Sequence, residues 1–207
     1  MSKKIIIDAG HGGNDSGACG NGLKEKELNL KMSLYQYEAL KKLGVNVGLT
    51  RSTDIDPGYQ RRAAQVKGNY DLCLCNHFNA FNGKASGVEA IHSVHDRPHL
   101  AEKLAKKVAQ TAGIPYRRTF TKKLPNGQDY FYIHRLTRPT QSIILEYGFI
   151  DHVGDMNFYK YETNFYKVAD AVVDILAEYA LGVGQSSASK PAKKPKKKSA
   201  SQSKPAT

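Results

Sequence analysis

The chain alternates short apolar runs with longer stretches in which apolar residues recur every three or four positions. The short runs have the length and composition of buried β-strands, and they cover residues 4–8, 45–51, 71–76, 87–94 and 141–146. The longer stretches have helical spacing, and they cover residues 24–43, 57–67, 98–112 and 164–181. Strands that alternate with helices predict an α/β fold, with a three-layer architecture and a mainly parallel twisted sheet flanked by helices on both faces.

The helix predicted over 24–43 is clearly marked in the sequence, whereas the segment 115–140 is not. In the helix predicted over 24–43, Leu28, Met32, Tyr35 and Ala39 form the expected apolar face, and Gly44 is the expected stop. The segment 115–140 shows neither period, but it contains a Pro-Asn-Gly turn and a tyrosine-rich stretch. We expect it to form a loop or a hairpin beside the functional site.

The composition changes abruptly near residue 182. Residues 183–207 contain seven lysines and no acidic residue, with Ser, Ala and Pro making up most of the rest. This composition predicts a disordered basic tail, so the folded domain is expected over 1–182 and the tail or linker over 183–207. The net charge of +12 therefore divides into +5 for the domain and +7 for the tail. No aromatic residue interrupts the tail lysines, so base stacking has no support and nucleic acid is not an expected partner.

Several protein classes are excluded by simple features. No apolar run approaches the ~18 residues that span a bilayer, so membrane insertion is not expected. The odd number of cysteines, Cys19, Cys73 and Cys75, argues against a disulfide framework. The N-terminal MSKKIIIDAG lacks the apolar stretch of about 7–15 residues of a secretory signal, which predicts synthesis in the cytoplasm.

Candidate catalytic residues follow the predicted strands. His11 lies just beyond the first strand, His77 directly follows the strand at 71–76, and Glu146 closes the strand at 141–146. Because ligands of open α/β sheets collect at the carboxyl ends of the strands, these side chains are expected at one edge, with Glu25 at the start of the next helix. Two histidines and a glutamate suit zinc and leave one position for water, while a further carboxylate handles the proton.

Spacing alone does not establish this site, because the compact HExxH pattern of zinc protease helices is absent. The motifs add a second argument. The run IIIDAGHGGNDSGACGNGLKEKELNL resembles the opening motif of the zinc-dependent N-acetylmuramoyl-L-alanine amidases of the amidase-3 (LytC/AmiC-like) family. LTRSTD, CNHFNA, GVEAIH and IILEYGFIDH continue the resemblance in the family's order, up to about Leu181.

The resemblance implies a residue for each role. Carried over by position, the zinc ligands fall on His11, Glu25 and His77, and the catalytic glutamate falls on Glu146. One Zn²⁺ per catalytic domain is therefore expected. The sequence departs from the family's pattern at Cys75 and Asn76, where serine and an aliphatic residue are usual. An arginine that often precedes the second histidine has two candidates here, Arg61 and Arg62, and the sequence does not decide between them.

Other readings of individual residues stay open. Glu27 is an alternative to Glu25 within KEKEL, and Cys73 and Cys75 form a conceivable thiolate site with His77. Further candidates for a metal, substrate or structural role are a histidine group, two more histidines and one carboxylate, namely His92, His95, His99, His134, His152 and Glu89.

The resemblance implies a peptidoglycan hydrolase that cleaves the amide bond between N-acetylmuramic acid and L-alanine of the stem peptide. The expected partner is bacterial peptidoglycan, and the basic tail is expected either to bind anionic wall polymers or to serve as a linker. A monomer is expected. The protein would act on the cell wall after release, as a phage endolysin or as an autolysin. A zinc peptidase or deacetylase acting on another wall bond, and a non-catalytic wall-binding module, are the alternatives.

Overall fold

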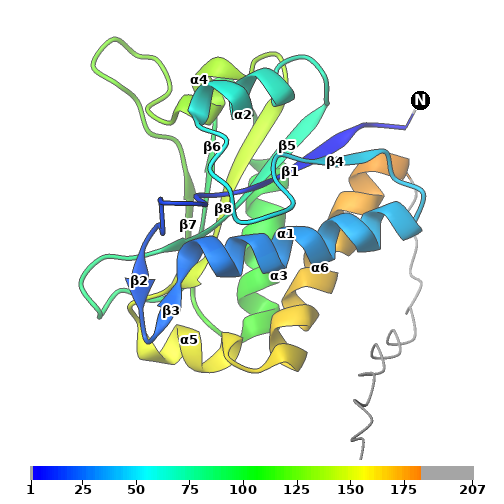
Figure 1. The fold of residues 1–207 in the computed structure, drawn as a ribbon. Helices are drawn as coiled ribbons and strands as arrows, with labels where there is room; N and C mark the ends of the chain where they lie inside the picture. The colour runs from blue at the N-terminus through cyan, green and yellow to red at the C-terminus, as the bar shows by residue number, and fades with distance from the viewer. Residues whose placement is uncertain (1, 183–207) are drawn as a thin grey trace, which may run out of the picture.

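The computed structural model describes residues 2–182, and it contains a six-stranded sheet with the strand order β4-β1-β5-β8-β6-β7 (Figure 1). Neighbouring strands are parallel except where β6 meets β8. In sheet order the strands are β4 (Val47–Leu49), β1 (Ile5–Ala9), β5 (Leu72–Asn79), β8 (Gln141–Phe149), β6 (Val88–His92) and β7 (Tyr116–Phe120).

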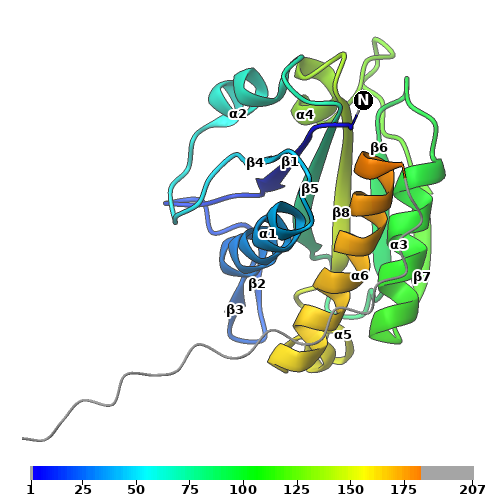
Figure 2. The same cartoon turned by 90° about the vertical axis from the view of Figure 1, so that its right-hand side faces the viewer.

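Helices cover both faces of this sheet, as Figure 2 shows. One face carries the three long helices α1 (Glu25–Lys42), α3 (His99–Ala112) and α6 (Glu162–Leu181). The other face carries the short helices α2 (Tyr59–Val66) and α4 (Tyr132–Leu136). The predicted fold class is therefore confirmed.

The two faces differ in their cores. The main hydrophobic core lies under α1, α3 and α6, whereas a smaller cluster under α2 and α4 contains Ile6, Cys73, Cys75 and Ile144. Since α2 and α4 are short, they leave part of their face open at the carboxyl ends of β1, β5 and β8. That opening is where a ligand is expected in an open α/β sheet.

The predicted strands and helices lie within a few residues of the observed ones. The segment 115–140 is more regular than expected, because it contains β7 and α4 joined by a turn at Leu124–Gly127. Helix α5 (Val153–Tyr159) and the two-stranded β2 (Cys19–Gly20) and β3 (Leu23–Lys24) were not predicted. These elements are short and carry no apolar period, so only their tertiary contacts distinguish them from loops.

The face of α1 that is fully buried differs from the predicted apolar face. Of the predicted face, Met32 is buried but Leu28, Tyr35 and Ala39 are only half-buried, and polar residues share the innermost positions with Met32 and Leu40. Ser33 and Gln36 accept hydrogen bonds from Asn76 Nδ2, each at 2.8 Å. Tyr147 closes this network from β8, so the polar groups of Gln36, Asn76 and Tyr147 are paired with one another. The spacing correctly predicted a helix, but it did not show that the helix docks through polar contacts.

None of the helices within residues 2–182 is long and apolar enough to cross a membrane. The tail predicted over 183–207 lies outside the described residues.

Candidate active site

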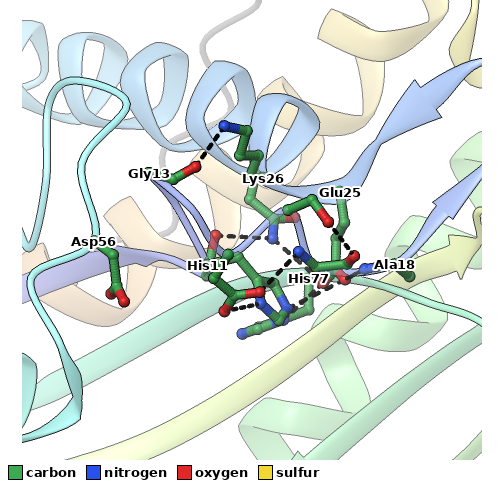
Figure 3. A network of polar contacts seen from close by, with 12 residues as sticks. His11, Gly13, Ala18, Glu25, Lys26, Asp56 and His77 are labelled. Carbon is green, nitrogen blue, oxygen red and sulfur yellow. Dashed lines mark hydrogen bonds and ion pairs between the residues drawn. The ribbon is translucent and has the colours of Figure 1, made fainter.

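Four predicted residues converge at the carboxyl edge of the sheet, and Figure 3 shows three of them, His11, Glu25 and His77. His11 follows β1, Glu25 begins α1, and His77 lies in β5. Glu146 lies in β8 directly beside His77, because these two residues are register partners.

Glu25 is the centre of this group. Its Oε1 lies 2.8 Å from His77 Nδ1, and its Oε2 lies 3.2 Å from His11 Nε2. The backbone N–H groups of Ala18 and Phe78 also donate to this carboxylate. With Glu25 only 4% exposed, these donors supply the stabilisation that a buried carboxylate requires.

The loop that carries His11 has an unusual backbone. His11 has φ of 60°, in the left-handed region that non-glycine residues seldom occupy. Arg62 Nη2 donates to the His11 carbonyl, and Arg51 Nη2 donates to the Gly10 carbonyl at 3.0 Å. Two arginines thus hold the strained loop in the conformation that turns His11 toward Glu25.

Two glycines are required by the close packing of the group. A Cβ at Gly10 would lie 2.2 Å from the His77 ring, and one at Gly17 would lie 2.6 Å from both Glu25 Oε2 and the His11 ring. Any side chain at either position would displace the imidazoles or the carboxylate.

A buried ion pair between Arg62 and Asp8 stabilises the same loop. Arg62 Nη1 lies 2.7 Å from Asp8 Oδ1, and both side chains are 3% exposed. Arg62 also donates to the Ala9 carbonyl. Arg61, the other candidate for this arginine, is exposed. Of the two, Arg62 is therefore the one that touches the site.

The histidines and Glu25 form a strongly coupled set. Burial lowers the pKa of His11, but the hydrogen bond and charge of Glu25, with those of Asp15, outweigh it and raise the pKa to about 9. Burial likewise opposes ionisation of Glu25, yet its hydrogen bonds with His11 and His77 bring its pKa well below the usual range. The site therefore favours an anionic carboxylate with a positive charge beside it.

The same donors suit a metal cation. One ligand atom from each of His11, Glu25 and His77 can be chosen so that all three lie within 4.8 Å of one another. Two imidazoles and a carboxylate can bind tetrahedral zinc with bonds of about 2.0–2.2 Å and leave a fourth position open for water. The Oδ2 atom of Asp15 lies 2.7 Å from His11 Nδ1, an outer contact typical of metal-bound histidine because it orients the ring.

Glu146 has the features of a proton carrier. Burial raises its pKa to about 7, although the charge of His77 acts in the opposite direction. Its Oε2 is buried and has no hydrogen-bond partner among residues 2–182. A carboxyl group that titrates near neutrality and has a free oxygen is suited to general acid–base catalysis.

His11, His77 and Glu146 line a cavity of about 520 Å³. Its floor is formed by β1, β5 and β8, through residues that include Asp8, Cys75 and Ile144. Its wall is formed by α2, α4 and their flanking loops, through Tyr59, Phe131, Tyr132 and Ile133. The size and the aromatic lining are those of a site for an organic ligand.

The other candidate metal ligands do not come together in the structure described by residues 2–182. Glu27 points to solvent with 63% of its side chain exposed. Cys73 and Cys75 lie 3.7 Å apart in the small apolar cluster. Within residues 2–182, His11, Glu25 and His77 are the one set of three or more His, Cys, Asp or Glu residues whose ligand atoms converge. The thiolate site and the group His92, His95 and His99 are not assembled.

Two other candidates have structural contacts. His152 caps α5 by accepting a hydrogen bond from the Asp155 backbone N–H. Glu89 is buried on β6 and forms ion pairs with Arg117 and Arg118.

His134 lies in α4 and is 1% exposed, and its Nδ1 shares a 2.7 Å hydrogen bond with Ser142 Oγ. Burial lowers the pKa of His134 from 6.5 to about 4, although Asp129 opposes the shift. Well above pH 6.5 the residue is neutral in both folded and unfolded chains. As the pH falls toward 4 the unfolded chain takes up a proton that the folded chain refuses, so we expect about 3 kcal/mol of stability to be lost.

Replacing His134 by asparagine should remove this pH dependence. Urea unfolding at several pH values between 7 and 4 gives the free energy of unfolding of the wild type and of the variant. The difference between the two free energies isolates His134, because all other groups titrate equally in both proteins. The exposed His99 provides the matched control, and His99→Asn should follow the wild-type curve. Parallel curves for His134→Asn and wild type would refute the assignment.

Sequence reasoning missed several residues around the site, notably Asp8, Asp15 and Arg51. Asp15 lies four residues beyond His11 in a glycine-rich loop, and Asp8 ends the apolar run of β1. The available signal for Asp8 and Asp15 was an acidic residue that interrupts or closely follows a buried strand. The partner of Asp8 is Arg62, which lies 54 residues further along the chain, and no local pattern connects the two.

Comparisons with known proteins agree with this geometry. Residues 5–178 match the family model described as N-acetylmuramoyl-L-alanine amidase. YqiI of Bacillus subtilis, an uncharacterised protein, is 33% identical over 86% of this chain and 84% of its own length. The N-acetylmuramoyl-L-alanine amidase LytC of the same organism is 30% identical over 86% of this chain but only 36% of LytC.

A solved structure shows the same fold. The catalytic domain of CwlV, an N-acetylmuramoyl-L-alanine amidase from Bacillus (Paenibacillus) polymyxa var. colistinus, superposes with a TM-score of 0.76 and 26% identity. The match covers 86% of this chain and 97% of that domain. The predicted family, fold and enzyme class are confirmed: the chain belongs to the N-acetylmuramoyl-L-alanine amidase family of peptidoglycan hydrolases.

Proposed function

We propose that this chain is a zinc-dependent amidase that cleaves the bond between N-acetylmuramic acid and L-alanine of the peptidoglycan stem. His11, Glu25 and His77 would hold the metal, and Glu146 is the general base and acid. The observation that carries the proposal is the convergence of these ligands beside Glu146, whose buried Oε2 has no partner among residues 2–182. The site of action would be the bacterial cell wall.

Zinc, when bound, lowers the pKa of water and polarises a carbonyl group. Glu146 accepts a proton from the attacking water at its free oxygen and delivers it to the alanine nitrogen as the C–N bond breaks. A pKa near 7 allows the same group to perform both transfers at neutral pH. The products are the free carboxylate of the lactyl group and a new N-terminal L-alanine.

The cavity fits the muramoyl side of this substrate. Tyr59, Phe131 and Tyr132 line its wall, and Tyr59 and Tyr132 meet edge to face at 5.8 Å. Aromatic side chains of this kind can bury the C–H surface of a sugar.

Metal removal tests the proposal. Chelation of the full chain should reduce the release of N-terminal alanine from purified peptidoglycan to background, and stoichiometric zinc should restore it. Zinc content and the chemical identity of the new amino group are measured together, the latter by amine labelling and mass spectrometry.

Each alternative predicts a different product. Release of acetate indicates a deacetylase, and new amino groups on interior D-residues indicate a peptidase. Wall binding without any new amino group or loss of turbidity indicates a binding module. Full activity after verified metal removal would exclude the zinc-dependent mechanism.

A further inference from the structure

A row of side chains crosses four neighbouring strands beside the candidate active site. His77 on β5 pairs with Glu146 on β8, Glu146 pairs with Glu89 on β6, and Glu89 pairs with Arg118 on β7. Register partners in a sheet project from the same face. The row therefore leads from the proposed metal site, past the proposed base, to a cationic residue at the edge of the sheet.

Glu89 anchors two arginines at the end of this row. Its Oε1 accepts from Arg117 Nε at 2.9 Å and from Arg118 Nε at 3.0 Å, and its Oε2 accepts from Asn79 Nδ2 at 3.0 Å. The Glu89 side chain is 3% exposed, whereas those of Arg117 and Arg118 are 39% and 56% exposed. One buried negative charge thus holds two accessible positive charges and leaves a net charge of about +1 for the cluster.

Both guanidinium groups are also supported by aromatic rings. Arg118 Cζ lies 4.1 Å from the centroid of the Phe120 ring, and Arg117 Cζ lies 5.1 Å from that of Phe149. Among residues 2–182, neither Nη of Arg118 makes a hydrogen bond. A planar guanidinium fixed by a ring and by one nitrogen presents its remaining donors as a fork, the arrangement that binds carboxylates.

The spacing of the row matches the length of a short peptide. Adjacent strands lie about 4.8 Å apart, so β7 is about 10 Å from β8 and the guanidinium groups that reach back to Glu89 are nearer. Two extended residues span about 7 Å. A peptide whose first nitrogen lies at Glu146 therefore brings the second residue's carboxyl group to the arginines.

We infer that Arg117 and Arg118 bind a carboxylate on the stem-peptide residue that follows alanine. The inference rests on the proposed amidase function, which places the alanine nitrogen beside Glu146. In peptidoglycan the residue after alanine is a glutamate whose α-carboxyl group is either free or amidated, so the arginine pair would favour the free form.

Two soluble substrates test the inference: N-acetylmuramoyl-L-alanyl-D-glutamate and the analogue with its α-carboxyl group converted to the amide. The wild type should cleave the carboxylate with a kcat/KM about 10- to 100-fold higher, mainly through KM, because charged hydrogen bonds contribute about that factor. Arg118→Gln and, separately, Arg117→Gln should lose most of this preference by slowing cleavage of the carboxylate alone. Arg61→Gln, at an exposed arginine outside the row, should keep the wild-type ratio.

The possible outcomes distinguish a failure of the proposed arginine site from a failure of the proposed amidase function. Equal cleavage of both substrates by the wild type, or equal loss on both substrates in both variants, overturns the arginine site and leaves the amidase function intact. A zinc-loaded wild type that cleaves neither these substrates nor peptidoglycan contradicts the amidase function, and the inference falls with it. Thermal unfolding of each variant identifies any general loss of structure, and Arg118→Lys should retain part of the preference because it keeps the charge.

Discussion

Replacing Glu146 by glutamine is expected to slow amide hydrolysis by about 100- to 10,000-fold, the usual contribution of a general base or acid. Glutamine has nearly the same shape but cannot accept the proton from water. Because one oxygen of the carboxyl group is buried and has no partner among residues 2–182, the loss of its charge should not weaken the fold. The rate of N-terminal alanine release from peptidoglycan measures the effect.

Zinc content and unfolding midpoint are the controls for this variant. Both should equal those of the wild type if Glu146 handles protons and does not hold the metal. Glu27→Gln is the matched substitution, since Glu27 is exposed on α1, and it should retain full activity. A Glu146→Gln protein that releases alanine at the wild-type rate would disprove the assignment of the base.

Local patterns in the sequence were enough to predict the layers of the fold. Buried strands such as β1 and β5 are continuous apolar runs because helices cover both of their faces. The same logic predicted the edge at which His11, His77 and Glu146 meet, since parallel strands end together. Family resemblance was needed to prefer Glu25 over Glu27, and the structure shows the physical reason: one side chain points inward to two imidazoles and the other points to solvent.

Contacts between polar residues that are distant along the chain could not be predicted from the sequence. The network that joins Gln36, Asn76 and Tyr147 is formed across 111 residues of chain, and nothing in the local context of these residues indicates that they meet. The pairing of Glu89 with two arginines depends in the same way on β7, a strand that the irregular segment 115–140 did not disclose. Such contacts leave no periodic signal, because each depends on the register of strands that meet only in the folded protein.

Replacing Arg62 by methionine is expected to destabilise the protein by about 3–5 kcal/mol, the typical effect of removing one partner of a buried ion pair. Methionine retains much of the apolar stem, but it leaves Asp8 buried opposite no cation and frees the His11 carbonyl. Urea unfolding measures the change. The neighbouring Arg61 is exposed on the same helix, so Arg61→Met should alter the stability by less than about 0.5 kcal/mol.

The double variant Asp8→Asn/Arg62→Met distinguishes the ion pair from simple packing. Since the main cost of the single variant is an uncompensated buried charge, neutralising Asp8 as well should restore part of the lost stability. Strictly additive losses would show that the two side chains act independently, against the 2.7 Å contact between them. Zinc affinity should be reduced in Arg62→Met and equally in the double variant, even where stability recovers, because the backbone of His11 in both lacks the guanidinium that holds it in the left-handed conformation.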